Sequence, residues 1–558
     1  MTRPALKSLS LPVTDSQKLH FSAADLRSVK EYLAAYTACD AWRGDFLTGI
    51  EDVLQPYRSR YETANQAARH AFITTLQTRA HAEPALAVLL LSFVFDLSKD
   101  PSLVPDLLAA VGARRDLPPH RHYNLFLHLT HLLMMNRAAF SAADYAHLRQ
   151  KSLRPLFARI MQRLRRTVPE PLAPYRADRK KVLVIANAIN NPRFTGPLWD
   201  ALEYAHSLHH DFGLEPLVVN SNIWLQTMAD PIWPLRWYST PPGKQRDYWP
   251  HRSDKLPLFR LWESSPTPVA LADFCALVQA ERPALAISIG DTNAYTELLA
   301  EQIPTYVMHF TVDFPITLCA RPTYHPNLPE TTLAIRRMAG QLDTNLVQLV
   351  PSYSVHGRYC RYTRRDFGVA EDACVYAVVG HRLDSEVTAD FLQLLNNILA
   401  AVPNGFVFFL GLFPSYRSRV APYPALSRRS AFIGNVGDVA SFMRIVDIYL
   451  NPDRAGGGSS AVYALDAGVP VLTLPHGDVA FAAGTDHHCT DYGSLQSRAV
   501  SLAADQALLR RARRMAKLRA AAICQRDVNM RLILQDAGIA PINPPGKPVA
   551  HREPETRT

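Results

Sequence analysis

The stretch VDIYLNPDRAGGGSSAVYALDAGVPVLTLPHGD, from Val446 to Asp478, carries the strongest structural signal in the chain. A short run rich in β-branched residues, Val446 to Leu450, is typical of a buried parallel strand. A glycine triplet and two serines follow, then an Ala/Leu-rich segment with helical spacing that ends at Gly468, and a second apolar run, Val469 to Leu474. This order of strand, glycine-rich turn, helix and strand predicts a βαβ unit.

The turn of this unit has the composition of an anion site. Gly457 and Gly458 place no side chain over the backbone N–H groups that open the helix, and the positive end of the helix dipole lies at the same point. The hydroxyls of Ser459 and Ser460 add further donors. We therefore expect a phosphate group to bind here. The alternative is a tight connection between strand and helix, in which glycine only relieves crowding.

Length and composition limit the classes of function. The chain has 558 residues, which suggests about three domains. Its net charge of +10 and pI near 9.2 favour anionic partners. Because Lys and Arg are not gathered into one long run, no nucleic-acid partner is expected. Seven cysteines at irregular spacing, without a CxxC pair, indicate reduced thiols in a cytoplasmic protein.

The sequence shows neither a signal peptide nor a membrane span. The first residues, MTRPALKSLSLPVTDS, lack the apolar core of a secretory signal. The longest apolar run, Ala85 to Phe95, is too short to cross a bilayer. A cytoplasmic location is the resulting expectation.

The first third of the chain predicts an all-α domain. Residues 1–20 form a loose arm, and 21–170 show apolar residues at three- and four-residue spacing with short breaks, which predicts five to eight helices. His128 and His131 share one helical face, with His120 and His122 nearby. A metal site is one interpretation, but ordinary helix-surface or core histidines fit better, because no carboxylate or cysteine joins them at ligand spacing.

Alternating strands and helices follow over 180–360. Predicted strands at 181–186, 217–220, 284–289 and 305–310 alternate with helical segments, which indicates a parallel sheet covered on both faces. Ligands of such sheets bind at the carboxyl ends of the strands. That edge would carry six polar residues: Asn187, Asn190, Asp291, Asn293, His309 and Asp313.

An aromatic insertion interrupts this domain at 224–264. It holds five of the seven tryptophans, namely Trp224, Trp233, Trp237, Trp249 and Trp262. Long loops without secondary structure are usually functional or disordered, and so many aromatic residues argue against disorder. We interpret it as a flap that grips a substrate or partner. A satellite core that covers the sheet is equally consistent.

A second alternating block spans 365–535 and contains the glycine-rich unit. Strands are expected at 375–380, 405–412 and 431–434, before the strand that opens the unit. Residues 501–519 predict one strongly basic helix, with Arg510, Arg511, Arg513, Arg514 and Lys517. A solvated face is its simplest meaning, and contact with a membrane surface is the alternative. The tail, 541–558, is polar, rich in proline and expected to be disordered.

Two consecutive sheet domains, the second with a phosphate loop, resemble the GT-B glycosyltransferases, which consist of two Rossmann-like domains. The stretch CRYTRRDFGVAEDACVYAVVGHR (360–382) resembles the entry to the nucleotide-sugar domain, and GGGSSAVYALDAGVPVLTLP (456–475) its donor-binding signature. VYAVVGHRLDSEVTADFLQLLNNILAAVPNG (375–405) is similar to protein O-GlcNAc transferases and bacterial adhesin N-glycosyltransferases, which also place a helical domain first. The resemblance implies an α/β fold of two Rossmann-like domains, a cleft between them, and a UDP-sugar donor.

The resemblance also implies roles for single residues. Gly457, Gly458, Ser459 and Ser460 would bind the diphosphate, and Arg382 would help to neutralise it. The lysine that those protein glycosyltransferases carry a few residues later is missing, and Ser385 and Glu386 stand there instead. Tyr463 occupies the position of the carboxylate that usually holds the ribose. Asp478 would meet sugar hydroxyls, or is a solvated turn residue. The candidate nucleotide-sugar residues are therefore Arg382, Gly457, Gly458, Ser459, Ser460, Tyr463 and Asp478.

Glycosyl transfer with inversion needs a base for the acceptor proton. The candidates are Asp313, Asp291 and His309, and the residues do not rank them. No DxD-type pair stands in a suitable place, so a metal-independent reaction without a cofactor is expected, with a protein side chain as the preferred acceptor. The alternatives are a transferase for a surface polysaccharide or lipid, a degenerate binding protein or chaperone, and a nucleotide-sugar epimerase.

Overall fold

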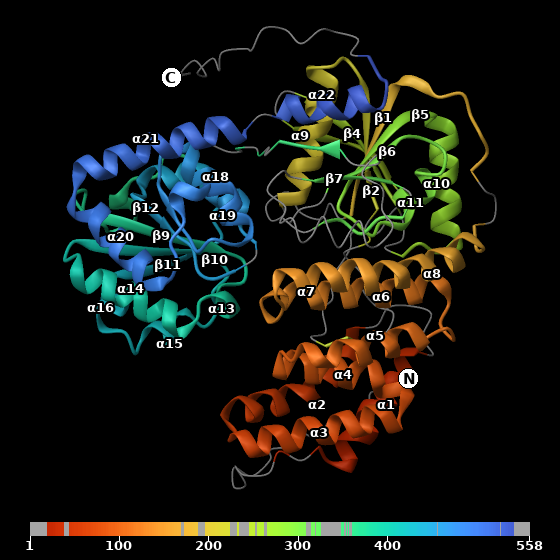
Figure 1. The fold of residues 1–558 in the computed structure, drawn as a ribbon, viewed down its shortest axis with the longest axis horizontal. Coiled ribbons are helices and arrows are strands. Elements are labelled where there is room, and N and C mark those ends of the chain that lie inside the picture. Colours follow the sequence, from red (N-terminus) through yellow and green to blue (C-terminus); the bar gives the residue numbers. More distant parts are fainter. Residues whose placement is uncertain are drawn as a thin grey trace. The chain divides into compact units, whose positions relative to one another are not determined.

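The fold is taken from a computed structural model of the full chain, shown in Figure 1. Most of the predicted arm at 1–20 and the predicted tail at 541–558 lie outside the described residues. The structure describes residues 19, 21–37, 44–168, 172–187, 196–221, 223, 232–233, 245–251, 254–261, 265–308, 314–318, 320–324, 347–350, 353, 355, 360–454, 456–524 and 526–540.

The chain forms two compact units. One comprises residues 1–140, 156–167 and 224–240, and the other comprises 141–155, 168–223 and 241–558. The first is helical and the second contains both β-sheets. An α/β fold of two Rossmann-like sheets, preceded by a helical region, is thus confirmed.

The described residues between 21 and 165 are largely helical, as the apolar spacing predicts. α4 is apolar on nearly every side, and ten of its fifteen residues are buried. Asn65 begins α3 by accepting the amide of Ala68 with its side chain at 2.9 Å. The helices in this region are α1 (Ala23–Thr37), α2 (Gly44–Thr63), α3 (Gln66–Ala82), α4 (Pro84–Ser98), α5 (Val104–Ala113), α6 (Pro119–Met135), α7 (Ala142–His147) and α8 (Arg154–Arg165).

His122 on α6 has a structural role. Its Nε2 lies 2.9 Å from the carbonyl oxygen of Val111, and its Nδ1 lies 2.9 Å from Nη1 of Arg163. The ring therefore donates to the carbonyl, accepts from the guanidinium and is neutral. Among the described residues, no group of three or more His, Cys, Asp or Glu side chains is placed to hold a metal ion. For His122 the structural interpretation holds.

We expect His122 to make the helical unit sensitive to acid. Burial lowers the pKa of its imidazole to about 4, from an ordinary value of 6.5. A lowered pKa in the folded state gives stability above pH 6.5 that is lost as the pH falls toward 4. At 1.36 kcal/mol per pH unit the loss is about 3 kcal/mol. The check is the unfolding free energy of α5 and α6 in urea, measured by hydrogen exchange at pH 7 and at pH 4.5. His122→Gln, which keeps both hydrogen bonds, should lose most of this pH dependence; an unchanged dependence would contradict the assignment.

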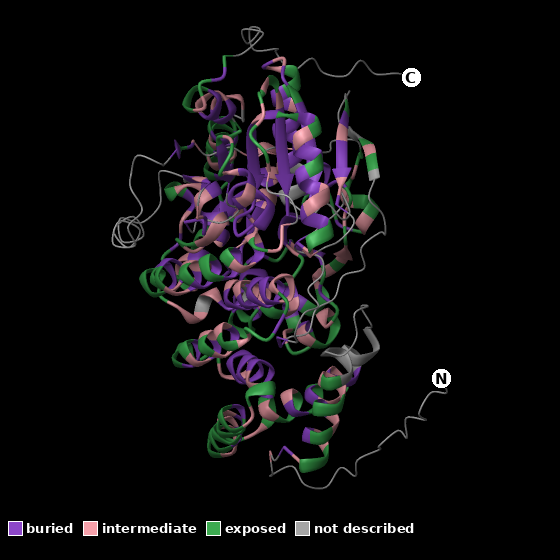
Figure 2. Cartoon of the chain, turned by 90° about the vertical axis from the view of Figure 1, so that its right-hand side faces the viewer, coloured by how far each residue is buried: buried purple, intermediate pink, exposed green. Residues whose placement is uncertain are grey.

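The first sheet has the strand order β3-β4-β2-β1-β5-β6-β7-β8. All pairs are parallel except β3 with β4. Figure 2 shows its central strands buried, with the helices around them exposed on their outer sides. The strands are β1 (Asp178–Ala186), β2 (Glu215–Asn220), β3 (Gln245–His251), β4 (Asp254–Arg260), β5 (Pro283–Ile289), β6 (Thr305–Met308), β7 (Arg321–Tyr324) and β8 (Val347–Gln348); the helices are α9 (Gly196–His210), α10 (Pro268–Glu281) and α11 (Ala294–Leu299).

The aromatic insertion is not a loop without secondary structure, so that expectation is wrong. Residues 245–251 and 254–260 form the antiparallel β3–β4 pair, which adds an antiparallel edge to the sheet. Trp233 is buried in the helical unit, where its amide donates to Ser92 Oγ at 2.8 Å and its indole N–H to Asp96 Oδ2 at 3.1 Å. Trp233 therefore contributes to the core of the helical unit, where it also packs edge-on against Phe93. Trp224, Trp237 and Trp262 lie outside the described residues.

The chain returns to the first sheet at its end. α22 (Arg526–Asp536) contributes Met530, Ile533 and Leu534 to the core around that sheet. The hydroxyl of Tyr306 on β6 donates to Asp536 at 2.5 Å. The segment predicted to close the second sheet domain at 535 thus packs against the first.

The second sheet is fully parallel, in the order β11-β10-β9-β12-β13. Alternate side chains of β9 enter two separate cores, one under α14, α16 and α20 and one under α17, α18, α19 and α21. The strands are β9 (Cys374–Gly380), β10 (Gly405–Gly411), β11 (Ser430–Gly434), β12 (Ile448–Leu450) and β13 (Val471–Leu472); the helices are α13 (Leu383–Glu386), α14 (Ala389–Ala401), α15 (Tyr416–Val420), α16 (Pro424–Arg428), α17 (Val439–Phe442), α18 (Gly458–Asp466), α19 (Gly477–Ala483), α20 (Tyr492–Ala504) and α21 (Gln506–Ile523).

The single basic helix predicted at 501–519 is wrong. Asp505 separates α20 from α21, and its Oδ1 accepts the amides of Ala507 at 2.8 Å and Leu508 at 3.0 Å. An aspartate that caps a helix start ends the preceding helix, and this signal was present in the sequence. In the described part of the chain, no helix is both long enough and apolar enough to cross a membrane.

Candidate active site

The order in which strands are added to the second sheet reverses between β9 and β12. β10 and β11 extend the sheet on one side of β9, whereas β12 and β13 extend it on the other. Loops that leave neighbouring strands at such a switch point diverge, and ligands of open α/β sheets bind there. Arg382 follows β9 and the glycine triplet follows β12, so both lie at this point.

The glycine loop has the geometry expected of an anion site. Gly457 has φ of +107°, and the amide and hydroxyl of Ser460 both donate to its carbonyl, at 3.2 and 2.7 Å. The amides of Gly458 and Ser459, which precede Ser460, open α18 without an intrahelical acceptor. A Cβ on Gly457 would lie 2.7 Å from a guanidinium nitrogen of Arg454. Glycine is therefore required both by the backbone angle and by this close approach.

A buried arginine, missed by the sequence interpretation, supports the loop. The Arg454 side chain is only 3% exposed. Its Nε donates to Asn451 Oδ1 at 2.7 Å and its Nη2 to the hydroxyl of Tyr449 at 2.8 Å, and that hydroxyl lies 2.9 Å from Ser460 Oγ. The available signal was an arginine two residues before the glycine triplet. These hydrogen bonds hold the buried guanidinium, and with it a positive charge, next to the glycine loop.

Glu386 joins Arg454 to Arg382. Its Oε1 accepts Arg382 Nε at 2.9 Å and Nη2 at 2.8 Å, and its Oε2 accepts Arg454 Nη1 at 3.1 Å. The guanidinium of Arg382 is partly exposed and lies 3.1 Å from where a Cβ on Gly456 would stand. Glu386 therefore holds both cations at the loop. Arg382, Gly457, Gly458, Ser459 and Ser460 are brought together, although the Ser460 hydroxyl is bonded to protein groups.

Tyr463 and Asp478 lie on the two helices that follow the loop. Tyr463 is half-buried on α18 and packs against the core beneath that helix. Asp478 stands in the first turn of α19, and its Cβ would be 3.2 Å from a Cβ on Gly458. Asp478 is therefore adjacent to the loop. Tyr463 is one helical turn along α18 from its start.

The first sheet brings three of its predicted edge residues together. β1 and β5 are neighbours at its own switch point, and Asn187 follows β1 while Asp291 and Asn293 follow β5. Asn293 Nδ2 donates to Asn187 Oδ1 at 2.7 Å, and Asn187 Nδ2 donates to the carbonyl of Asp291 at 3.3 Å. Asn190, His309 and Asp313 lie outside the described residues.

Asp291 is buried and ion-paired. Its Oδ2 accepts Arg149 Nη2 at 2.5 Å and the amide of Ile316 at 2.8 Å, and Arg149 Nε donates to the carbonyl of Phe314 at 3.2 Å. Both side chains of the pair are under 10% exposed. Arg149 lies in a predicted helical segment, where nothing in the sequence distinguished it. This geometry ties the 314–316 segment to the end of β5.

We expect Asp291→Asn to lower stability. The amide keeps an acceptor for Ile316 but removes the negative charge that compensates the buried Arg149. A hydrogen bond to a charged group contributes about 1.5–3 kcal/mol, and a loss of that size in unfolding free energy is expected. Urea-dependent hydrogen exchange of β5 measures it. A variant as stable as the parent would contradict this structural role of Asp291.

Comparisons with known proteins give structural likeness only. No protein-family model matches the chain, and no curated protein matches it. Among solved structures, a mutant O-GlcNAc transferase from Thermobaculum terrenum is 15% identical with a TM-score of 0.42, covering 93% of this chain and 99% of its own. WaaG, a glycosyltransferase involved in lipopolysaccharide biosynthesis, is 12% identical with a TM-score of 0.43, covering 64% and 100%.

A third solved structure is Anabaena Alr3699/HepE in complex with UDP and glucose. It is 13% identical with a TM-score of 0.43, covering 64% of this chain and 98% of its own. At these identities and scores the likeness is one of fold alone. The candidate site is therefore defined by its own geometry, a glycine loop and two linked arginines at the switch point of a parallel sheet.

Proposed function

We propose that the chain is a nucleotide-sugar-dependent glycosyltransferase with a UDP-sugar donor. One observation carries this proposal. The open amides of α18 and the guanidinium of Arg382 meet at the switch point between β9 and β12, with Arg454 fixed behind them. Amides at a helix start and an arginine fork are the donors that phosphate oxygens prefer.

These residues match the electrostatic demand of glycosyl transfer. When the bond between the sugar and the diphosphate breaks, negative charge grows on the departing phosphate oxygen. The amides of Gly458 and Ser459 and the exposed Arg382 would donate to those oxygens. Arg454 adds positive charge that is already in place, because its three protein partners hold it. Preorganised donors of this kind stabilise charge without reorganisation during the reaction.

The other parts of the proposal concern the acceptor side. The reaction would be metal-independent, with a protein side chain as acceptor and with Asp313, Asp291 or His309 as the base. The ion pair of Asp291 with Arg149 favours a positioning role for Asp291, which leaves Asp313 and His309 for proton transfer. Tyr463 would contact the nucleoside and Asp478 the sugar. A cytoplasmic location belongs to the same proposal.

A panel of nucleotide sugars tests the proposal. The purified chain is incubated with each UDP-, GDP- and ADP-sugar in the presence of EDTA, and free nucleoside diphosphate is measured with and without a peptide library. Acceptor-dependent UDP release supports a protein glycosyltransferase. Turnover of the sugar without any acceptor indicates an epimerase. Absence of binding to every nucleotide would favour a scaffold and overturn the proposal.

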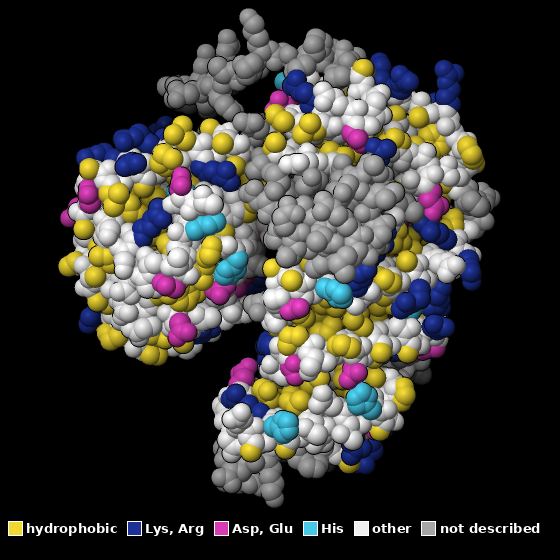
Figure 3. All heavy atoms as spheres, in the orientation of Figure 1, with side chains coloured by type: hydrophobic (Ala, Val, Ile, Leu, Met, Phe, Trp, Pro, Cys, Tyr) yellow, Lys and Arg dark blue, Asp and Glu magenta, His cyan; other side chains and the backbone are white. Residues whose placement is uncertain are grey.

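A transferase acting at a lipid surface is the second candidate. α21 exposes Leu508, Met515 and Leu518 to solvent, at 40%, 41% and 64%. Arginines 510, 511 and 514 lie on the same helix, and Figure 3 shows Lys and Arg side chains next to apolar ones along the edge where α21 runs. Basic helices with exposed apolar residues bind anionic membranes. Adding anionic lipid vesicles as acceptors to the same panel distinguishes the two candidates.

A further inference from the structure

A cavity lies in the C-terminal sheet domain, away from the glycine loop. Its volume is about 880 Å³, and it lies where the strands begin, between that edge of the sheet and α21. Cys374 opens β9, Asp447 immediately precedes β12, and Gly468 and Val469 precede β13. All strands of the sheet are parallel, so this edge is opposite to the edge that carries the glycine loop.

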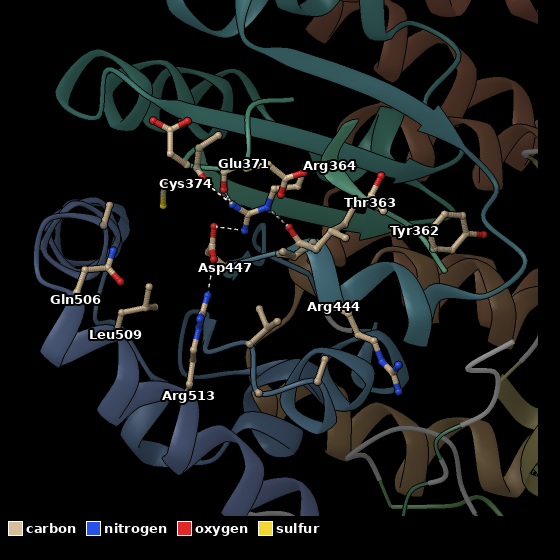
Figure 4. Close-up of a pocket in the computed structure, with 18 of the residues that line it drawn as sticks. Tyr362, Thr363, Arg364, Glu371, Cys374, Arg444, Asp447, Gln506, Leu509 and Arg513 are labelled. Carbon is tan, nitrogen blue, oxygen red and sulfur yellow. Dashed lines mark hydrogen bonds and ion pairs between the residues drawn. The ribbon is translucent and has the colours of Figure 1, made fainter. Parts of the chain in front are cut away.

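A buried carboxylate organises the wall of this cavity. Asp447 Oδ2 accepts Arg364 Nη2 at 2.8 Å and the amide of Val375 at 2.8 Å, while its Oδ1 pairs with Nη2 of Arg513. Figure 4 shows the guanidinium groups of Arg364 and Arg513 pointing at Asp447 from opposite sides. Arg364 also donates to the carbonyls of Glu371, Ala373 and Ile445. The guanidinium of Arg364 is thus fully engaged by protein acceptors. The guanidinium of Arg513 uses one nitrogen, Nη2, to bind Asp447.

The remaining cations of the lining have no carboxylate partner in the described part of the chain. The cavity wall contains five cationic side chains and three acidic ones, a formal charge of +2. Within the described ranges, no ion pair involves Arg444, Arg514 or Lys517. Lys517 passes beside Gly468, where a Cβ would lie 2.9 Å from its Cε, so it stands at the carboxyl end of α18. The partial negative charge at that helix end is about half an elementary charge. It offsets only part of the formal charge of +2, so the cavity wall remains positive.

We propose that this cavity binds a phosphorylated small molecule with at least two negative charges, held by Arg513, Arg514 and Lys517. Small-molecule sites have volumes of about 300–1,000 Å³, so the cavity accommodates a ligand of nucleotide size. Arginine forks and a lysine ammonium are the side-chain donors that bind phosphate groups. Asp447 orients Arg513 toward the cavity without neutralising the other cations. This site is independent of the donor site, because it uses the opposite edge of the sheet.

Titration calorimetry with inorganic pyrophosphate at low ionic strength tests the proposal on the full chain. Gly456→Val, which fills the space beside Arg382, removes binding at the glycine loop and isolates the second site. Arg514→Gln/Lys517→Gln removes two cations from the cavity. Arg510→Gln/Arg511→Gln removes the same charge from the same helix outside the cavity lining and is the matched control.

The expected result is that pyrophosphate still binds Gly456→Val, that its affinity falls about tenfold or more when Arg514→Gln/Lys517→Gln is added, and that the control changes it less than about twofold. If the control variant weakens pyrophosphate binding equally, the effect comes from the overall positive charge of the helix and not from the cavity, and the proposal is overturned. Loss of all binding in Gly456→Val alone would also overturn it, while leaving the donor site standing. Citrate that binds the cavity as tightly as pyrophosphate would overturn the assignment to phosphate.

Discussion

Gly456→Val is expected to weaken UDP binding by about 100-fold or more, with little change in stability. A Cβ on Gly456 would meet only the guanidinium of Arg382, at 3.1 Å, which is the end of a flexible and partly exposed side chain. The fold therefore accommodates the valine, whereas a bound phosphate would have to occupy the same space as the valine side chain. Losing contact with the amides and with Arg382 removes at least two charge-assisted hydrogen bonds of about 1.5–3 kcal/mol each, or about 3 kcal/mol or more in total, and tenfold in affinity corresponds to about 1.4 kcal/mol.

A matched control separates this effect from a general effect of valine in a loop. A Cβ on Gly437 would meet no atom within 4 Å, so Gly437→Val is expected to leave UDP affinity unchanged. Gly458→Val is less selective, since its Cβ would lie 3.2 Å from the carbonyl oxygen of Asp478 and 3.1 Å from the hydroxyl of Tyr353. Calorimetric titration of UDP into each variant measures the affinities. A Gly456→Val variant that binds UDP as the parent does would remove the phosphate assignment.

The fold was predictable where local pattern and burial agree. β9 and β10 are short apolar runs buried on both faces, and their predicted bounds agree with the structure within one residue. The β3–β4 pair was not predictable in the same way, because its strands are rich in polar and aromatic residues and one of them forms an edge. The return of α22 to the first sheet depends on packing between distant segments, which sequence periodicity does not encode.

The candidate site was predictable in its backbone and not in its charges. Three consecutive glycines before a helix indicate open amides from composition alone, and the positive φ of Gly457 fits that prediction. Glu386 and Arg454 are 68 residues apart, so their pairing depends on β9 and β12 being neighbours. Arg149 and Asp291 are 142 residues apart and meet for a similar reason. Ion pairs of this separation are consequences of topology, and only the structure reveals them.

Glu386→Gln is expected to lower the stability of the C-terminal sheet domain by about 3–5 kcal/mol, the usual result of leaving a buried charge without its partner. Arg454 is 3% exposed, and Glu386 is the carboxylate that pairs with it. The glutamine is nearly isosteric, so packing around Gly380 is kept while the compensating charge is lost. Because Arg382 is held by the same carboxylate, UDP affinity should fall as well.

A double-mutant cycle identifies the cause. Adding Arg454→Met removes the uncompensated charge and should restore part of the lost stability, which gives the pair a coupling energy. Hydrogen exchange of peptides from β9 and β12 in increasing urea is the appropriate measurement, since all seven tryptophans lie before residue 265. Arg382→Ala is the control, because its side chain is 42% exposed and its removal should weaken UDP binding without lowering stability. If the stability losses of the two single variants simply add in the double variant, Glu386 and Arg454 act independently. The link that Glu386 makes between Arg454 and Arg382 would then contribute nothing to stability.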